Sequence, residues 1–93
     1  MNEVEIIELI SDEIEANSKA IGRSKRGIIE YMLSDGEYEE AFEILLKHYM
    51  DNDIDVKLIP RSLLIEMSIF CKLDENPLNP MFHEKLVKYS SAK

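Results

Sequence analysis

The sequence predicts an all-α fold in which four to five short helices form one compact bundle over residues 1–93. Apolar residues recur every three or four positions along most of the chain, which is the period of an amphipathic helix. Scarcely any stretch alternates apolar and polar residues as a half-buried strand does. A chain of 93 residues, 45% of them hydrophobic, can build one core but not two, so we expect a single helical domain.

The first predicted helix covers residues 2–21. Its polar positions are acidic up to Ser18, and the earliest of these carboxylates suit the positive end of the helix dipole. Gly22 is expected to end the helix. The apolar positions are Val4, Ile6, Ile7, Leu9, Ile10, Ile14 and Ala16.

Two further helices are predicted before the middle of the chain. A short one covers residues 24–34, with Ser24 as its N-cap and Gly36 as the breaker after its end. The next covers residues 37–50 and has the clearest periodicity in the chain. Its apolar positions are Tyr38, Ala41, Phe42, Leu45, Leu46 and Tyr49.

A polar connection over residues 51–55 follows, rich in side chains that favour turns. The apolar residues of 56–59 are expected to pack as an extended strip. A fourth helix is predicted to begin at Pro60, since the first helical turn tolerates proline, and to be broken by Asn76-Pro77.

A last short helix is expected to open at Pro80, and the tail over residues 90–93 is expected to be frayed. The helical faces together predict a shared core. Its expected members are Ile10, Ile14, Ile29, Leu33, Phe42, Leu45, Tyr49, Leu64, Met67 and Phe70.

The charge balance bears on the class of partner. Eleven Lys and Arg residues against nineteen Asp and Glu residues give a formal net charge of −8, which disfavours direct binding of nucleic acid phosphates. The basic cluster of Lys19, Arg23, Lys25 and Arg26 is therefore expected to neutralise neighbouring carboxylates.

The single cysteine, Cys71, lies in an apolar run and cannot form an internal disulfide. The N-terminus lacks the basic start of a signal peptide, and no apolar run approaches the roughly 20 residues of a membrane span. We expect a cytoplasmic protein without a membrane partner.

The aspartates of the polar connection share the spacing of the first ligands in a calcium-binding helix-loop-helix. Asp51, Asp53 and Asp55 match, but Val56 stands where the loop requires Gly, and Ser62 stands where a Glu should close the shell. We therefore expect a solvated turn there, and no metal site.

Catalytic groups are sparse. His48, His83 and Cys71 have no paired spacing for a zinc site, and Cys71 is more simply a small core residue. No glycine-rich phosphate loop or Ser/His/Asp arrangement is present. We expect neither a cofactor nor an enzyme, although small bundles can hide carboxylate sites, so a carboxylate enzyme stays a distant alternative.

The acidic exterior of the 37–50 helix and the turn after it admit two interpretations. The carboxylates can form an ordinary solvated face, or they can dock a cationic partner and speed its association. On the second interpretation the candidate binding residues are Glu39, Glu40, Glu43, Asp51 and Asp53. The acidic residues of the first helix are the competing surface.

A short motif supports the docking interpretation. It consists of Gly36-Glu37-Tyr38, then Ala41, Glu43 and Leu45, then Asp53 and Ile54 in an acidic turn. This pattern resembles the core of the MafI-like and contact-dependent-inhibition immunity proteins, which are small, acidic, helical bacterial proteins. The similarity extends loosely over residues 28–73, about half of the chain.

The resemblance implies a cytosolic antidote that binds the C-terminal toxin domain of a cognate effector, often a nuclease, and blocks its active site or substrate surface. Family members often have small residues where this chain has Glu39 and Glu40, and an aliphatic residue at Phe42, so partner specificity is expected to differ there. The alternative is a helical adaptor or regulator that buries an amphipathic partner helix. Oligomeric state stays open.

Overall fold

In the computed structural model, which describes residues 1–91, the backbone forms six α-helices, one 3₁₀ turn and no strand. The all-α prediction is therefore confirmed for this part of the chain. None of these helices is long and apolar enough to cross a membrane. The helices are α1 (Glu3–Ala16), α2 (Ser18–Ile21), α3 (Arg23–Ser34), α4 (Tyr38–Asn52), α5 (Arg61–Phe70) and α6 (Phe82–Ser91), with the 3₁₀ turn η1 (Leu73–Glu75) after α5.

The single helix predicted over residues 2–21 is two helices in the structure, because the helical conformation is interrupted at Asn17. Asn17 leaves the helical conformation (φ −114°, ψ 25°), and its side-chain amide donates hydrogen bonds to Tyr49 Oη and to the carbonyl of Asp55, both at 3.0 Å. These tertiary contacts explain a break that the apolar periodicity does not reveal. At the other end of α1, Asn2 and Glu5 form a capping box.

A glycine lies near each end of α3, Gly22 before it and Gly36 after it. Gly22 has a φ of 91° and is the N-cap, so the helix begins one residue before Ser24, and the prediction of Ser24 as the cap is wrong. Gly36 has a φ of 81°, as a residue just after a helix often does. The N–H of Glu37 bonds the carbonyl of Met32, and that of Gly36 bonds the carbonyl of Leu33. This Schellman arrangement confirms Gly36 as the breaker.

The remaining boundaries differ by a few residues from the predictions. α4 continues two residues beyond residue 50, to Asn52, and its C-cap Asp53 adopts a left-handed conformation (φ 54°). Pro60 lies just before α5 instead of inside it, and α5 ends at Phe70 instead of continuing to Asn76, because Lys72 adopts a left-handed conformation (φ 62°). The last helix begins at Phe82, two residues after Pro80. α6 continues through Ser91, so the frayed tail is wrong for residues 90 and 91, while residues 92 and 93 lie outside the described part of the chain.

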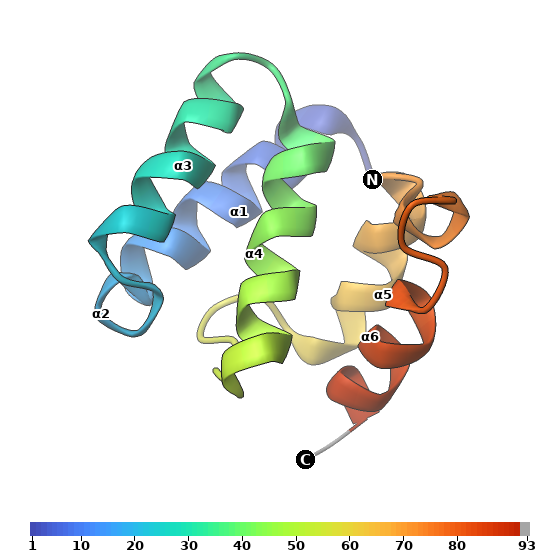
Figure 1. The fold of residues 1–93 in the computed structure, drawn as a ribbon. Helices are drawn as coiled ribbons and strands as arrows, with labels where there is room; N and C mark the ends of the chain where they lie inside the picture. The colour runs from blue at the N-terminus through green and yellow to red at the C-terminus, as the bar shows by residue number, and fades with distance from the viewer. Residues whose placement is uncertain (92–93) are drawn as a thin grey trace.

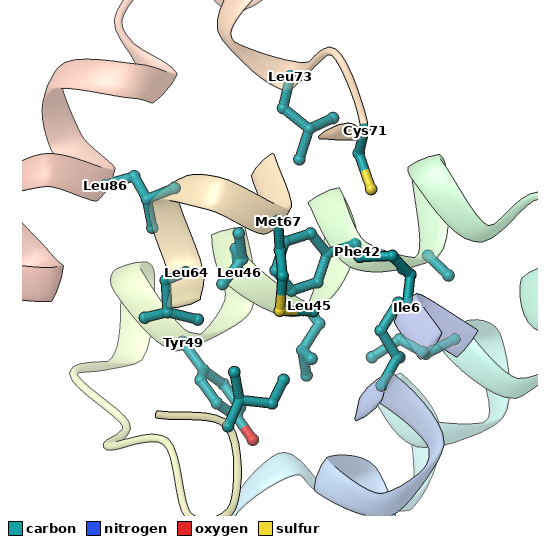
Figure 2. Packing of buried hydrophobic residues seen from close by; sticks show 14 of the residues in the cluster. Ile6, Phe42, Leu45, Leu46, Tyr49, Leu64, Met67, Cys71, Leu73 and Leu86 are labelled. Atoms are coloured by element: carbon teal, nitrogen blue, oxygen red, sulfur yellow. The ribbon is translucent and has the colours of Figure 1, made fainter. Parts of the chain in front are cut away.

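α4 is the central helix, with α1 and α3 on one side and α5 and α6 on the other (Figure 1). Side chains from both sides meet around Phe42, Leu45 and Tyr49, which are fully buried (Figure 2). Eight of the ten predicted core residues are buried, whereas Leu33 and Phe70 are only half-buried at the edge of the core. Phe70 there contacts the ring of Tyr38, with 6.4 Å between the ring centroids.

Candidate partner-binding surface

The first half of α4 carries three of the five predicted binding residues. Its apolar face turns Phe42 and Leu45 into the core. Outside this face Glu40 is exposed, whereas Glu39 and Glu43 are half-buried. Residues three and four apart on a helix are neighbours, and these carboxylates therefore share one area of surface. Their position in the first turns also suits the positive end of the helix dipole.

A groove runs between this part of α4 and the segment after α5. Carboxylates dominate its walls, and Lys72 is the one basic residue among the lining residues of the described chain. We call it the acidic groove; its lining includes Glu37, Glu39, Glu40, Glu43, Lys72, Glu75, Asn76 and Pro77. Within residues 1–91, none of its carboxylates lies within 4.0 Å of a cationic group.

Asn76 connects the two walls of the acidic groove. Its side-chain amide donates a 3.2 Å hydrogen bond to Glu43 Oε2, and its side-chain oxygen accepts a 2.9 Å bond from the backbone N–H of Leu78. The Leu78 side chain is 92% exposed. The acidic groove is therefore bordered by a loop that a carboxylate of α4 helps to hold in place.

Cys71 lies under the acidic groove and behaves as a core residue. The side chain is 1% exposed, and burial together with the negative charge of Glu39 raises the pKa of its thiol to about 12. A thiol with so high a pKa stays protonated at neutral pH and is a poor nucleophile. The interpretation of Cys71 as a small core residue is confirmed.

Asp51 and Asp53 do not join the acidic groove. Asp51 lies eight residues after Glu43, about 12 Å farther along the helix axis, in a hollow that Lys25 and Lys47 also line. Asp53 is the left-handed C-cap of α4. The structure thus brings together three predicted binding residues and separates the other two from them.

The three aspartates of the 51–55 segment lie in different local structures. Asp51 is helical, Asp53 caps α4, and Asp55 forms a 2.8 Å ion pair with Arg61. Across residues 1–91, no group of three or more His, Cys, Asp or Glu side chains is placed to hold a metal ion.

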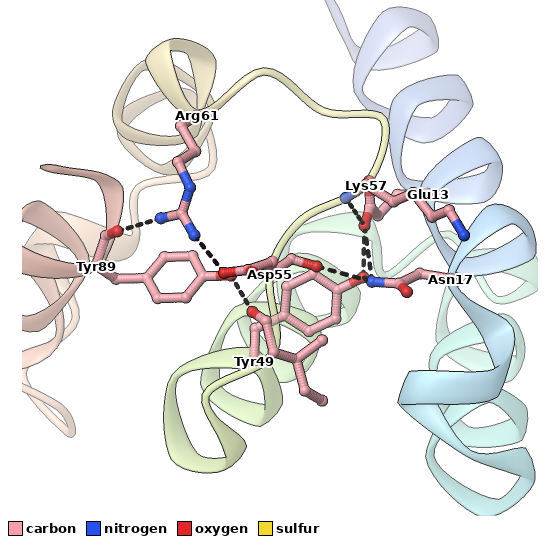
Figure 3. Close-up of polar contacts among 8 residues, drawn as sticks. Glu13, Asn17, Tyr49, Asp55, Lys57, Arg61 and Tyr89 are labelled. Atoms are coloured by element: carbon pink, nitrogen blue, oxygen red, sulfur yellow. Dashed lines mark hydrogen bonds and ion pairs between the residues drawn. The ribbon is translucent and has the colours of Figure 1, made fainter. Parts of the chain in front are cut away.

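Sequence reasoning missed one buried carboxylate, Glu13, which joins α1 to α4 and to the segment before α5 (Figure 3). Tyr49 Oη donates a 2.6 Å hydrogen bond to Glu13 Oε2, and the backbone N–H of Lys57 donates another at 2.9 Å. Glu13 Oε1 accepts from the N–H groups of Leu58 and Ile59 at 2.7 and 3.0 Å. Both oxygens are occupied, so this carboxylate positions the 57–59 backbone and does not face solvent.

These contacts also decide the ionisation of the pair. Burial alone would raise the pKa of Glu13, but the hydrogen bonds from Tyr49 and the three backbone N–H groups outweigh burial and lower its pKa below the ordinary value of 4.5. Burial, reinforced by the bond to Glu13, raises the pKa of Tyr49 well above its usual range. At neutral pH a charged Glu13 therefore accepts from a neutral Tyr49.

A second polar cluster holds α6 against the same segment. Arg61 pairs with Asp55, donates to the carbonyl of Tyr89, and lies over the Tyr89 ring at 4.6 Å from its centroid (Figure 3). The Tyr89 hydroxyl donates to the carbonyl of Ile54. Together, Glu13 and Tyr89 bond four backbone groups of the irregular segment between α4 and α5.

The positions that remain are structural or peripheral. His48 Nε2 lies 2.9 Å from the carbonyl of Ile21, at the edge of the core. Of the basic cluster, Arg26 forms a 2.9 Å ion pair with Glu30, so neutralisation of neighbouring carboxylates is seen for this member.

Comparison of the chain with protein-family models, curated proteins and solved structures found no match.

Proposed function

We propose that this chain is an immunity protein that binds the basic nuclease toxin domain of a cognate effector and blocks its active site or substrate surface by stoichiometric binding. The acidic groove is the proposed contact surface. The observation that supports it best is the gathering of five carboxylates around one lysine, without ion pairs among residues 1–91 to neutralise them.

Charge complementarity provides the physical reason. A protein that grips nucleic acid phosphates carries exposed Lys and Arg side chains, and a surface of fixed carboxylates can occupy the same positions as the phosphates. Such a surface also steers the encounter and raises the association rate. The formal charge of −8 extends this attraction beyond the acidic groove itself.

The position of the groove supports the proposal further. Glu37, Glu39 and Glu43 are presented by a rigid helix start, and Asn76 ties Glu43 to the opposite wall. The motif that resembles the MafI-like immunity proteins begins at Gly36, in the turn between α3 and α4. The carboxylates of the acidic groove on α4 follow directly after this turn. Glu39 and Glu40, where the chain departs from the family pattern, belong to the acidic groove.

The test is charge reversal in cells that express the toxin domain encoded beside this protein. The variant Glu39→Lys/Glu40→Lys/Glu43→Lys should lose protection, because like charges set against a basic partner cost several kcal/mol. Cell survival and the abundance of the variant are measured together. Circular dichroism of the purified variant should match the unmodified protein.

The matched control is the variant Glu15→Lys/Asp51→Lys/Glu84→Lys, which changes the net charge equally. These three carboxylates are exposed and lie outside the acidic groove. This variant should keep protection. Full protection by the groove variant at normal abundance would show that the acidic groove is not the contact surface, and no binding of the unmodified protein to the toxin domain would refute the proposed function.

A further inference from the structure

A second groove lies between α1 and α5. Glu5, Glu8, Leu9 and Asp12 line it from α1, and Leu63 and Glu66 line it from α5. The four residues of α1 lie at positions i, i+3, i+4 and i+7, so they share one side of the helix. We call this the α1–α5 groove. It shares no lining residue with the acidic groove.

The floor and the rim of the α1–α5 groove differ in chemistry. Leu9 and Leu63 are half-buried and pack against the core, so the groove has an apolar floor. The side chains of Glu8, Asp12 and Glu66 are exposed at the rim, and among the lining residues of the described chain the one cationic group is the α-amino group of Met1. Glu5, at one end, is engaged in the helix cap and lies 3.9 Å from the α-amino group of Met1.

We propose that the α1–α5 groove binds a basic amphipathic helix of another protein. An apolar row on such a helix covers Leu9 and Leu63, as in other helix-in-groove complexes, and Lys or Arg side chains on its flanks reach Glu8, Asp12 and Glu66. From Glu5 to Asp12 this side of α1 extends about 10 Å, which matches two turns of a bound helix.

Charge complementarity selects this occupant over others. An acidic amphipathic helix would bring like charges against three exposed carboxylates, which is unfavourable. A basic segment without apolar side chains would leave the leucine floor uncovered. The acidic groove provides a contrast, because Cys71 and Leu73 beneath it are buried and its accessible lining is dominated by charge. The inference stands independently of the proposed function.

Three peptides of about 14 residues, a length at which helices are marginal in water, test the inference. The first has leucines three and four apart on one face and lysines on the flanks. The second replaces the leucines with glutamine, and the third replaces the lysines with glutamate. Binding is followed by fluorescence anisotropy, and its location by shifts of the Leu9 and Leu63 methyl resonances.

The first peptide should bind and shift both leucines, the second should bind at least about tenfold more weakly, and the third should not bind. Equal affinity for the first two peptides, or shifts confined to the acidic groove, would overturn the inference. The first result would mean that the protein binds any cationic peptide, and the second would mean that the peptide binds at the acidic groove.

Variants locate the site. Glu8→Gln/Asp12→Asn should weaken the first peptide by about tenfold, whereas Glu15→Gln/Glu84→Gln, exposed residues outside both grooves with the same change in net charge, should alter its affinity by less than about twofold. Both pairs replace carboxylates with amides of the same shape, and circular dichroism checks that the fold is retained. Equal weakening by both pairs would show that the peptide responds to net charge and not to the α1–α5 groove.

Discussion

The hydroxyl of Tyr49 donates a 2.6 Å hydrogen bond to the carboxylate of Glu13, 36 positions earlier in the chain. Both side chains have no exposed surface. The same carboxylate accepts three backbone N–H groups of residues 57–59. One side chain of α1 therefore holds α4 and the irregular segment before α5 together. The N–H groups of residues 57–59 lie outside any helix, and Glu13 supplies the acceptors that a helix would otherwise provide.

Replacement of Glu13 with Gln should destabilise the protein by about 2–3 kcal/mol. The amide keeps the shape, but it lacks the charge and carries an NH₂ group that cannot accept from the N–H donors, so buried donors are left without partners. Urea unfolding followed by circular dichroism measures the loss. Glu15→Gln, on the same helix but exposed, is the control and should change the stability by less than about 0.5 kcal/mol.

The contribution of Glu13 should also depend on pH. Its pKa is lowered in the folded protein, so between the folded and unfolded pKa values the unfolded chain binds more protons, and stability rises with pH. The stabilisation is complete above the ordinary value of 4.5 and is lost as the pH falls through the lower folded pKa. The difference in unfolding free energy between the unmodified protein and Glu13→Gln should shrink below about pH 4.5. A difference that stays constant down to acid pH would contradict this assignment.

Phe42 is fully buried where the helices on both sides of α4 meet. Phe42→Ala should cost about 3–5 kcal/mol, which is enough to unfold a small domain of marginal stability. Phe42→Leu, which leaves a smaller cavity, should be less destabilised and still fold. Tyr31→Ala provides a control because Tyr31 is 66% exposed, and thermal unfolding of the three variants gives the comparison. A stable Phe42→Ala protein would place this ring outside the core.

Association with a basic toxin domain should slow as salt is added. The Debye length falls from about 30 Å at 0.01 M to about 8 Å at physiological ionic strength, so attraction by the carboxylates of the acidic groove is screened. Stopped-flow rates should drop by at least about tenfold over this range. A rate that does not respond to salt would favour an interface dominated by apolar burial, as an adaptor would use.

The sequence predicts α3 and α4 well, because their periodicity is strong and Gly22 and Gly36 lie at the two ends of α3. The end of α5 at Phe70 is missed, because apolar residues continue at helical spacing to Leu73. The break at Asn17 could not be predicted in the same way. The apolar pattern continues past it, and its cause is a pair of contacts with Tyr49 and Asp55, which are far away in sequence.

Glu13 was hidden for a related reason. It stands in an acidic run, where each carboxylate resembles an exposed neighbour. One sign was present: Glu13 follows Ile6 by seven residues, which places it within about 20° of a buried position around the helix. For the candidate site, helical spacing correctly groups Glu39, Glu40 and Glu43, whereas their separation from Asp51 depends on the length of α4, and the opposite wall of the acidic groove depends on the tertiary fold.

The carboxylates that hold the fold and those that line the acidic groove are different residues. Glu13 is enclosed by five donors, whereas within residues 1–91 the side chains of the acidic groove make one hydrogen bond across it, from Asn76 to Glu43. Substitutions at exposed carboxylates of the acidic groove should therefore cost little stability. On the proposed function, mutation at Glu39 and Glu40 changes the partner, while the contact between Glu13 and Tyr49 keeps the chain folded.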